Sequence, residues 1–153
     1  LGFESKIKEL VANGCWVLGI CVGMQMLGDH SAEFGFHKGL GLISGSVKRV
    51  GEGSRNGVDI KLPHVGWSRV SKSGAVADND IETLNLDGMP FYFVHSLFVD
   101  PQDDLSFSCS TSFGEQSFCS SFGKDKIFAT QFHPEKSGES GLSLCINFFN
   151  LIK

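Results

Sequence analysis

The sequence predicts a single α/β domain built on an open, mixed and mainly parallel sheet that helices flank. Three observations predict this fold class. A short apolar run at residues 15–20 is followed directly by a helical pattern, two further apolar runs lie at 91–94 and 127–132, and the chain closes on an amphipathic helical pattern. Such continuous apolar runs are typical of strands that parallel sheets bury on both faces. The 153 residues hold neither an internal repeat nor a dividing linker, so we expect one domain.

The first expected element is a helix that ends at Asn13-Gly14. Its apolar residues share one face: Phe3, Ile7, Leu10 and Val11. Because a strand usually precedes the first helix of an α/β unit, we expect residues 1–153 to form a domain that lacks its first strands and is incomplete at the N-terminus. A strand at 15–20, a sharp turn and a helix at about 22–27 are expected next.

Short alternating runs replace this pattern between about residues 40 and 70. The runs at 46–50 and 58–62 flank Asn56-Gly57, a dipeptide typical of hairpin turns, so both are expected to be hairpin strands. The polar stretch 71–80 is expected to be a surface loop. The remaining expected elements are strands at 91–94, 106–110, 117–122 and 127–132, and a C-terminal helix whose apolar side carries Leu142, Leu144, Cys145, Phe148, Phe149 and Ile152.

Composition argues against several classes of function. The chain has 13 Lys and Arg against 17 Asp and Glu, a net charge of −4 without a basic stripe, so nucleic-acid binding is not expected. No apolar run reaches the ~18–20 residues of a membrane span, and no signal-peptide pattern opens the chain. The five cysteines form no C-x-x-C pair, which is typical of reduced thiols in a cytoplasmic protein and not of a disulfide framework or a zinc site.

Cys21 lies in the segment Gly19-Ile20-Cys21-Val22-Gly23, where the expected strand turns into the expected helix. A nucleophile on such an elbow needs small neighbours, as in the corresponding serine motif. The helix N-terminus would lower the pKa of the thiol, and the N–H group of Val22 would face the oxyanion of a tetrahedral intermediate. A free cysteine can equally be a small buried hydrophobic residue. With Gln25, however, the pattern G-x-C-x-G-x-Q has a chance of about one in a thousand of arising at random.

His133-Pro134-Glu135 follows another expected strand and supplies the groups that a thiol nucleophile needs. The imidazole could accept the thiol proton and return it to a leaving amine. The carboxylate could hold the ring in one tautomer. His95 also follows an apolar strand. Because active sites of open α/β sheets lie at the carboxyl ends of strands, Cys21 and His133 are predicted to lie side by side there.

Five segments together carry a family resemblance. They are Gly19–Gln25 (GICVGMQ), Gln131–Ser137 (QFHPEKS), Pro63–Trp67 (PHVGW), Phe91–Ser96 (FYFVHS) and Asn147-Phe148. The first two resemble the class I (triad) glutamine amidotransferases, and the other three narrow the resemblance to the glutaminase subunits of imidazole glycerol phosphate synthases. The matching motifs extend from Gly14 to Phe148, which is nearly the whole chain.

The resemblance implies a flavodoxin-like α/β architecture and hydrolysis of glutamine to glutamate with release of ammonia. It implies that Cys21 attacks the side-chain amide, that His133 transfers the proton and that Glu135 orients His133. It implies no cofactor and no metal ion.

The resemblance also implies which residues contact the glutamine substrate. Gln25 and Glu33 would do so, Glu33 at the α-amino group. Backbone groups after the strand at 91–94 would hold the α-carboxylate, in the segment His95, Ser96 and Leu97. Family members usually carry Tyr where this chain has Leu97, so no role for a phenol is expected.

A partner enzyme is expected because ammonia released into neutral water becomes protonated and is then no nucleophile. The sequence shows no second set of reactive residues that could use the ammonia. The resemblance implies a (β/α)₈-barrel cyclase that makes imidazole glycerol phosphate for histidine biosynthesis, and it places His64, Trp67 and Lys136 toward that partner. Ser68 stands where family members commonly carry Asn.

The oxyanion loop of the family, a Pro-Gly-x-Gly segment, does not occur within residues 1–153. Because loss of one oxyanion donor typically lowers the rate ~10²–10³-fold, we expect these residues alone to be inactive or poorly folded. Three other interpretations stay open. The chain could be a paralogue that supplies ammonia to a sugar-modifying partner in surface polysaccharide synthesis, it could be a catalytically silent protein that only binds a partner, or Cys21, His95 and His133 could hold a metal ion.

Overall fold

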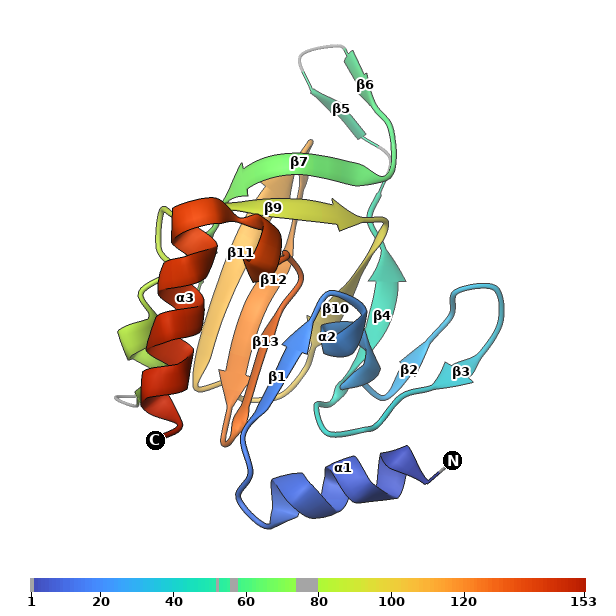
Figure 1. Ribbon diagram of the computed structural model, residues 1–153. Helices are drawn as coiled ribbons and strands as arrows, with labels where there is room; N and C mark the ends of the chain where they lie inside the picture. The colour runs from blue at the N-terminus through green and yellow to red at the C-terminus, as the bar shows by residue number, and fades with distance from the viewer. Residues whose placement is uncertain (1, 52, 56–57, 74–79) are drawn as a thin grey trace.

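The computed structural model describes residues 2–51, 53–55, 58–73 and 80–153. Its five-stranded sheet has the order β1 (Val17–Ile20), β13 (Ile127–Thr130), β12 (Gln116–Lys124), β11 (Phe107–Phe113) and β8 (Ser71–Lys72). Helix α3 (Gly138–Leu151) lies along one face of this sheet, and the short helix α2 (Val22–Met26) follows β1 and packs on the other side (Figure 1).

A second sheet and two ribbons complete the described β structure. The second sheet has the order β10 (Leu97–Pro101), β4 (Gly45–Arg49), β2 (His30–Ser31) and β3 (His37–Lys38). The ribbons are β5 (Gly53–Arg55) with β6 (Val58–Ile60), and β7 (His64–Arg69) with β9 (Pro90–His95). The β7–β9 ribbon crosses the end of the molecule toward which β1 points, at the top of Figure 1. The other described helical elements are α1 (Phe3–Ala12), η1 (Asp80–Leu84) and η2 (Pro134–Lys136).

Strand β13 shows why its sequence is almost wholly apolar. All four of its residues are buried, because helices and loops cover both faces of the sheet at this strand. Phe128 points into the core cluster that holds Leu144 and Phe148 of α3, whereas Ile127 and Ala129 belong to the second cluster, with residues of α1, α2 and β4. Two cores on opposite faces therefore fix β13 and β1 at the centre of the fold.

The expected α/β class and the mixed sheet with flanking helices are confirmed. The expectation of mainly parallel pairing is wrong for the described residues, in which only β1–β13 and β2–β4 are parallel. The physical reason lies in the connections. Gly114-Glu115 joins β11 to β12 and Asp125-Lys126 joins β12 to β13. Two-residue connections allow antiparallel pairing, whereas a parallel pair needs a longer crossover.

The hairpin expected around Asn56-Gly57 forms on nearer strands than the sequence predicted. β5 pairs with β6, whereas residues 45–49 form β4 and pair with β10 and β2. Asn56-Gly57 itself lies outside the described residues. Within the stretch expected to be a loop, Ser71-Lys72 adds the short edge strand β8, and residues 74–79 lie outside the described part.

The two long helices are observed where the sequence predicted them, but in each of them fewer apolar residues pack against the core than expected. In α1, Ile7 and Val11 pack against the core, whereas Phe3 and Leu10 are exposed. In α3 the buried side is Gly141, Leu144 and Phe148, and the predicted Leu142, Phe149 and Ile152 are exposed. Apolar residues occur around much of α3, so its composition does not select one face. No helix among the described residues is both long and apolar enough to span a membrane.

Candidate active site

Cys21 lies on a sharp elbow between β1 and α2. Its backbone has φ 52° and ψ −108°, a conformation that L-residues rarely adopt. The Cys21 N–H donates to the carbonyl oxygen of Thr130 at 2.7 Å, which fixes the elbow to the neighbouring strand. At Gly19 a Cβ would lie 3.0 Å from the Leu27 side chain and 3.1 Å from the Gly23 backbone, a close approach that favours glycine at the first of the two positions. A Cβ atom added at Gly23 would have no neighbour within 4 Å, so steric contact does not require glycine at the second position.

The parallel pairing of β1 with β13 brings the two predicted catalytic motifs to one edge of the sheet. Ile20 lies opposite Thr130, so Cys21 and the residues after β13 emerge at the same end. The Cys21 sulfur lies 3.6 Å from Nε2 of Gln131. In the described structure this amide, and not His133, is the side-chain hydrogen-bond partner of the sulfur.

His133 and Glu135 form the expected pair. Nδ1 of His133 lies 2.6 Å from Oε1 of Glu135, which leaves Nε2 of the ring as the nitrogen for proton transfer. The His133 N–H donates to the carbonyl oxygen of Tyr92 at 2.9 Å, and its own carbonyl accepts from Oγ of Ser137 at 2.6 Å. These backbone contacts tie the histidine to β9 and to the start of α3.

The Cys21 thiol has a raised pKa, in contrast to the lowered value that the helix N-terminus predicted. Burial is the main cause, because it disfavours the charged thiolate. Hydrogen bonds from the Val22 N–H and the Gln131 amide lower the pKa, as does the charge of Lys136, whereas the negative charge of Glu135 raises it. The pentapeptide helix α2 does not outweigh burial. The thiol therefore needs a base to become nucleophilic near neutral pH.

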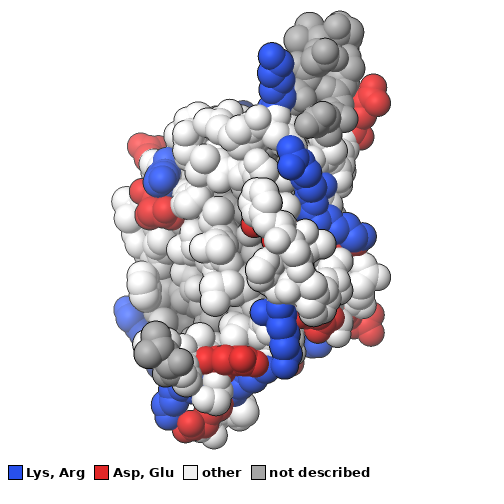
Figure 2. Space-filling view, turned by 90° about the vertical axis from the view of Figure 1, so that its right-hand side faces the viewer, with Lys and Arg blue, Asp and Glu red and all other residues white. Residues whose placement is uncertain are grey.

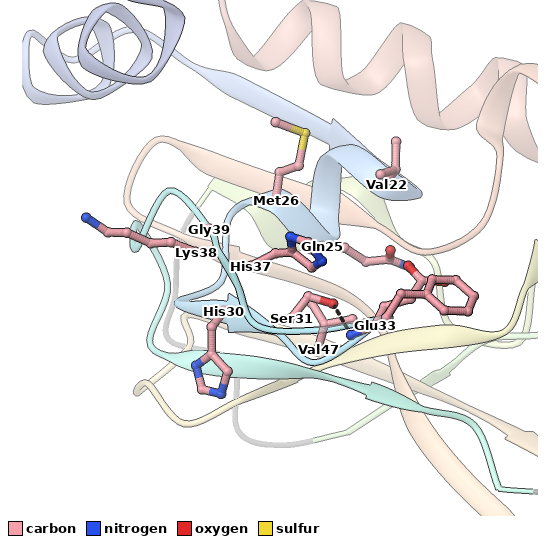
Figure 3. Close-up of a pocket in the computed structure, with 11 residues that line it drawn as sticks. Val22, Gln25, Met26, His30, Ser31, Glu33, His37, Lys38, Gly39 and Val47 are labelled. Carbon is pink, nitrogen blue, oxygen red and sulfur yellow. Dashed lines mark hydrogen bonds between the residues drawn. The ribbon is translucent and has the colours of Figure 1, made fainter.

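A pocket of about 320 Å³ lies beside the elbow. Figure 3 shows that α2 contributes Val22, Gln25 and Met26 to its wall and that the β2–β3 hairpin contributes Glu33 and His37. The predicted substrate residues Gln25 and Glu33 thus line one cavity. Val22 lines the same cavity and directly follows Cys21 in the chain.

A neighbouring pocket of about 470 Å³ shares part of this wall. Glu33 lines both pockets, and Ser96 and Leu97 line the second. The structure therefore brings together four of the five predicted substrate residues. The carbonyl oxygen of Leu97 is already engaged, because Nε2 of Gln25 donates to it at 3.1 Å.

His95, the fifth predicted substrate residue, lines neither of these two pockets. Its side chain is buried, with Nδ1 at 2.7 Å from the carbonyl oxygen of Leu97 and Nε2 at 3.0 Å from Nδ1 of His64. Both ring nitrogens therefore have partners within the protein, whereas the expectation for this segment concerns backbone groups that would hold the α-carboxylate. Along β9 the side chains alternate, and His95 points inward with Phe91 and Phe93.

The structure contradicts the expectation that His64 faces a partner, because the side chain is buried. It is only 2% exposed, stacks on Phe93 and packs against Phe113, and its Nε2 lies 2.9 Å from Oγ of Ser68. Alternation along β7 turns His64 inward and leaves Trp67 57% exposed. Burial, and then the neighbouring His95, lower the pKa of His64 to about 4. Burial also lowers the pKa of His95, so both rings are neutral at pH 7.

Gln131 is a site residue that the sequence interpretation missed. Its side chain is fully buried and lies between Gln25 and Cys21. Its position directly after β13, two residues before His133, was the signal that could have identified it. Among the residues that the structure describes, no group of three or more His, Cys, Asp or Glu could hold a metal ion.

The face shown in Figure 2 carries charged side chains of both signs around a mostly uncharged centre. The exposed apolar residues of the structure include Val22 and Met26 of α2 and Phe34 and Phe36 between β2 and β3. This mixed distribution is not the basic footprint of a nucleic-acid-binding surface.

Comparisons with known proteins agree with the sequence motifs. The family model described as "Glutamine amidotransferase class-I" matches residues 2–151. The imidazole glycerol phosphate synthase subunit HisH of Geobacter metallireducens is 45% identical over 149 residues, which cover 96% of this chain and 69% of that protein.

Two solved structures are similar in fold. One is a protein of Thermoplasma acidophilum provisionally named as one subunit of a GMP synthase, with a TM-score of 0.61 and 22% identity over 97% of this chain and 63% of that chain. The other is a glutamine amidotransferase of Thermotoga maritima, with a TM-score of 0.55 and 23% identity over 96% of this chain and 52% of that chain.

Proposed function

The chain belongs to the class-I glutamine amidotransferase family, and we propose that it is the glutaminase subunit of an imidazole glycerol phosphate synthase. The observation that carries the proposal is the convergence of the Cys21 elbow and the His133–Glu135 pair at the carboxyl ends of two adjacent parallel strands. The similarity to HisH proteins supports the choice of synthase.

The proposed reaction begins at Cys21. His133 takes the thiol proton, and the thiolate attacks the side-chain carbonyl carbon of glutamine. The N–H of Val22, at the start of α2, donates to the oxyanion that forms. His133 then gives the proton to the leaving nitrogen, which departs as ammonia and leaves a thioester. His133 takes a proton from water, the water oxygen attacks the thioester, and glutamate leaves as the thiol is restored.

Glutamine fits the pocket between α2 and the β2–β3 hairpin. The Glu33 carboxylate, on the rim of both pockets, would pair with the α-amino group of the substrate. Ser96 and Leu97 line the adjoining wall, where backbone groups would hold the α-carboxylate. Gln25 lines the same pocket together with Val22, the residue that follows Cys21 in the chain.

A partner would receive the ammonia on the side of the β7–β9 ribbon. The outward face of this ribbon exposes Val65, Trp67 and Val94, and Lys136 is exposed on the adjoining η2. The carbonyl of Tyr92 in β9 accepts the His133 N–H, so this face adjoins the catalytic histidine. A (β/α)₈-barrel cyclase seated here would cover this face and keep the ammonia from water. No role for a cofactor or metal ion is needed in these steps.

The test measures glutamate release and imidazole glycerol phosphate formation by the complex of the full-length protein with the cyclase. With glutamine as nitrogen source we expect both products, and with Cys21→Ser we expect neither above background. Supplying ammonium salt at high pH should restore imidazole glycerol phosphate formation to the Cys21→Ser complex, because the cyclase is unaltered.

Cys15→Ser is the matched control, since Cys15 is an exposed thiol away from the elbow, and it should leave both rates unchanged. Unchanged glutamate release by Cys21→Ser would contradict the proposed nucleophile. Glutamate release without formation of imidazole glycerol phosphate would keep the glutaminase activity and contradict the proposed synthase.

A further inference from the structure

The buried amide of Gln131 connects the predicted nucleophile to the wall of the substrate pocket. Its Oε1 lies 3.2 Å from Nε2 of Gln25, and its Nε2 lies 3.6 Å from the sulfur of Cys21. The side chain is 0% exposed, and the backbone N–H of Gln131 donates to the carbonyl oxygen of Ser120 at 2.8 Å. Backbone and side chain are thus both held in place.

Gln131, Gln25 and the Leu97 carbonyl oxygen form a series of hydrogen bonds. The orientation of the Gln131 amide follows from the Leu97 end of this series. The carbonyl oxygen of Leu97 can only accept, so the Gln25 atom that faces it at 3.1 Å is a nitrogen. The same nitrogen faces Gln131, so the Gln131 atom on that side must be the oxygen. The remaining Gln131 atom, which faces Cys21, is therefore the NH₂ group, and it donates to the sulfur.

We propose that Gln131 is a positioning residue for the nucleophile: its amide holds the Cys21 sulfur in place and stabilises the thiolate, while Gln25 fixes the direction of the amide. The inference rests on the proposed role of Cys21 in the glutaminase reaction. It explains how a thiol that burial keeps protonated can still reach the reactive form when His133 takes its proton. It also links the pocket to the nucleophile, because substrate contacts at Gln25 act on the residue that orients Gln131.

The test compares Gln131→Glu and Gln131→Met with the unaltered protein. Gln131→Glu keeps an oxygen acceptor for Gln25 but replaces the donor to sulfur with a second oxygen. Gln131→Met has similar length and loses donor and acceptor together. Iodoacetamide reacts with the thiolate, so its rate of reaction with Cys21 against pH, followed by mass spectrometry of the Cys21 peptide, reports the ionisation of this thiol alone.

We expect the midpoint of the Cys21 reaction to move up by about one pH unit in Gln131→Met and further in Gln131→Glu. For glutamate release, kcat should fall ~10- to 100-fold in Gln131→Glu, with KM for glutamine changed less than about threefold. Gln102→Met and Gln102→Glu, at an exposed glutamine, are the matched controls and should change nothing. Midpoints that stay at the unaltered value in both Gln131 variants would overturn the inference while leaving the proposed function intact.

A measurement on the unaltered protein decides the question if the Gln131 variants do not fold. The side-chain NH₂ resonances of Gln131, observed by nitrogen-15 NMR, should shift with pH as Cys21 ionises, and this shift should be lost in Cys21→Ala. Resonances that do not follow the Cys21 titration would overturn the inference. Absence of glutaminase activity in the unaltered complex would instead contradict the proposed function.

Discussion

The molecule holds two histidine centres that use the same side chain in opposite ways. At the edge of the central sheet, His133 is partly exposed and pairs with the carboxylate of Glu135. In the β7–β9 ribbon, His64 and His95 are buried and bond to each other, with Ser68 at one end and the Leu97 carbonyl at the other. The first centre keeps a ring nitrogen for chemistry, whereas the second uses its ring nitrogens for structure.

The donor and acceptor of each hydrogen bond in the buried centre can be assigned by starting from the Leu97 carbonyl. The Leu97 carbonyl can only accept, so Nδ1 of His95 carries the proton and Nε2 of His95 accepts from Nδ1 of His64. Nε2 of the neutral His64 then accepts from the Ser68 hydroxyl. Burial keeps both rings uncharged, and the comparison shows that surroundings, and not the presence of histidine in a motif, decide which ring can transfer a proton.

The largest expected effect that separates the two centres is on catalysis. His133→Ala should lower kcat for glutamate release ~10³- to 10⁴-fold, because the proton-transfer group is lost. The free energy of unfolding should change by less than about 1 kcal/mol, since the Tyr92 and Ser137 contacts of His133 involve its backbone. Glutamate release and urea unfolding of the same preparation check both statements. A large loss of stability would make His133 a structural residue like His64.

The converse effect is expected at His64. His64→Ala removes a ring packed against Phe93 and Phe113 and leaves Nε2 of His95 without its donor, so the free energy of unfolding should fall by about 3 kcal/mol. Once folded, the variant should keep kcat within about threefold of the unaltered protein, because His64 does not line either pocket. Urea unfolding and glutamate release under native conditions are the measurements. Lost activity at unchanged stability would contradict the structural role.

The pH dependence of stability sharpens the comparison further. The pKa of His64 is about 4 in the folded protein and 6.5 in its ordinary state. Between these two pH values His64 therefore binds a proton in the unfolded chain but not in the folded one. The free energy of unfolding should therefore be highest above pH 6.5 and fall by up to about 3 kcal/mol as the pH drops to 4. The pKa of His95 is lowered too and acts in the same direction. Urea titrations from pH 7 to pH 4 test this, and His64→Ala should show a shallower slope.

The sequence placed Cys21 and His133 at the correct edge of the sheet but did not show that His64 is buried, and the difference has a physical reason. Carboxyl ends of neighbouring parallel strands meet at one edge, so placing Cys21 and His133 needed only the strand ends and not their detailed packing. His64 and His95 depended on which face of a two-stranded ribbon packs inward, and alternation alone does not reveal this. Gln131 carries neither charge nor nucleophile, so only its neighbours show its role.

Much of the fold followed from local patterns, and the differences come from long-range pairing. Asn56-Gly57 predicted a hairpin, but residues 45–49 pair with β2 and with β10, and β10 is about fifty residues away along the chain. The C-terminal helix was predicted in place, yet Leu142 and Phe149 are as apolar as the buried Phe148. In that case the residues that the helix meets, and not its own sequence, select the buried face.

The smallest predicted effect tests whether Glu135 acts on both halves of the site. Glu135 is half exposed, so solvent screens its charge, and Glu135→Gln keeps an oxygen that can accept from Nδ1 of His133. We expect kcat for glutamate release to fall only about tenfold, because the charge that stabilises the imidazolium is lost.

The negative charge of Glu135 also raises the pKa of Cys21, so removing it should let iodoacetamide modify Cys21 at lower pH. Slower catalysis with a more readily ionised thiol would separate the effect of Glu135 on the base from its effect on the nucleophile. Glu139→Gln on α3 is the control and should change neither, and a thiol that becomes harder to ionise in Glu135→Gln would contradict this account of the charge.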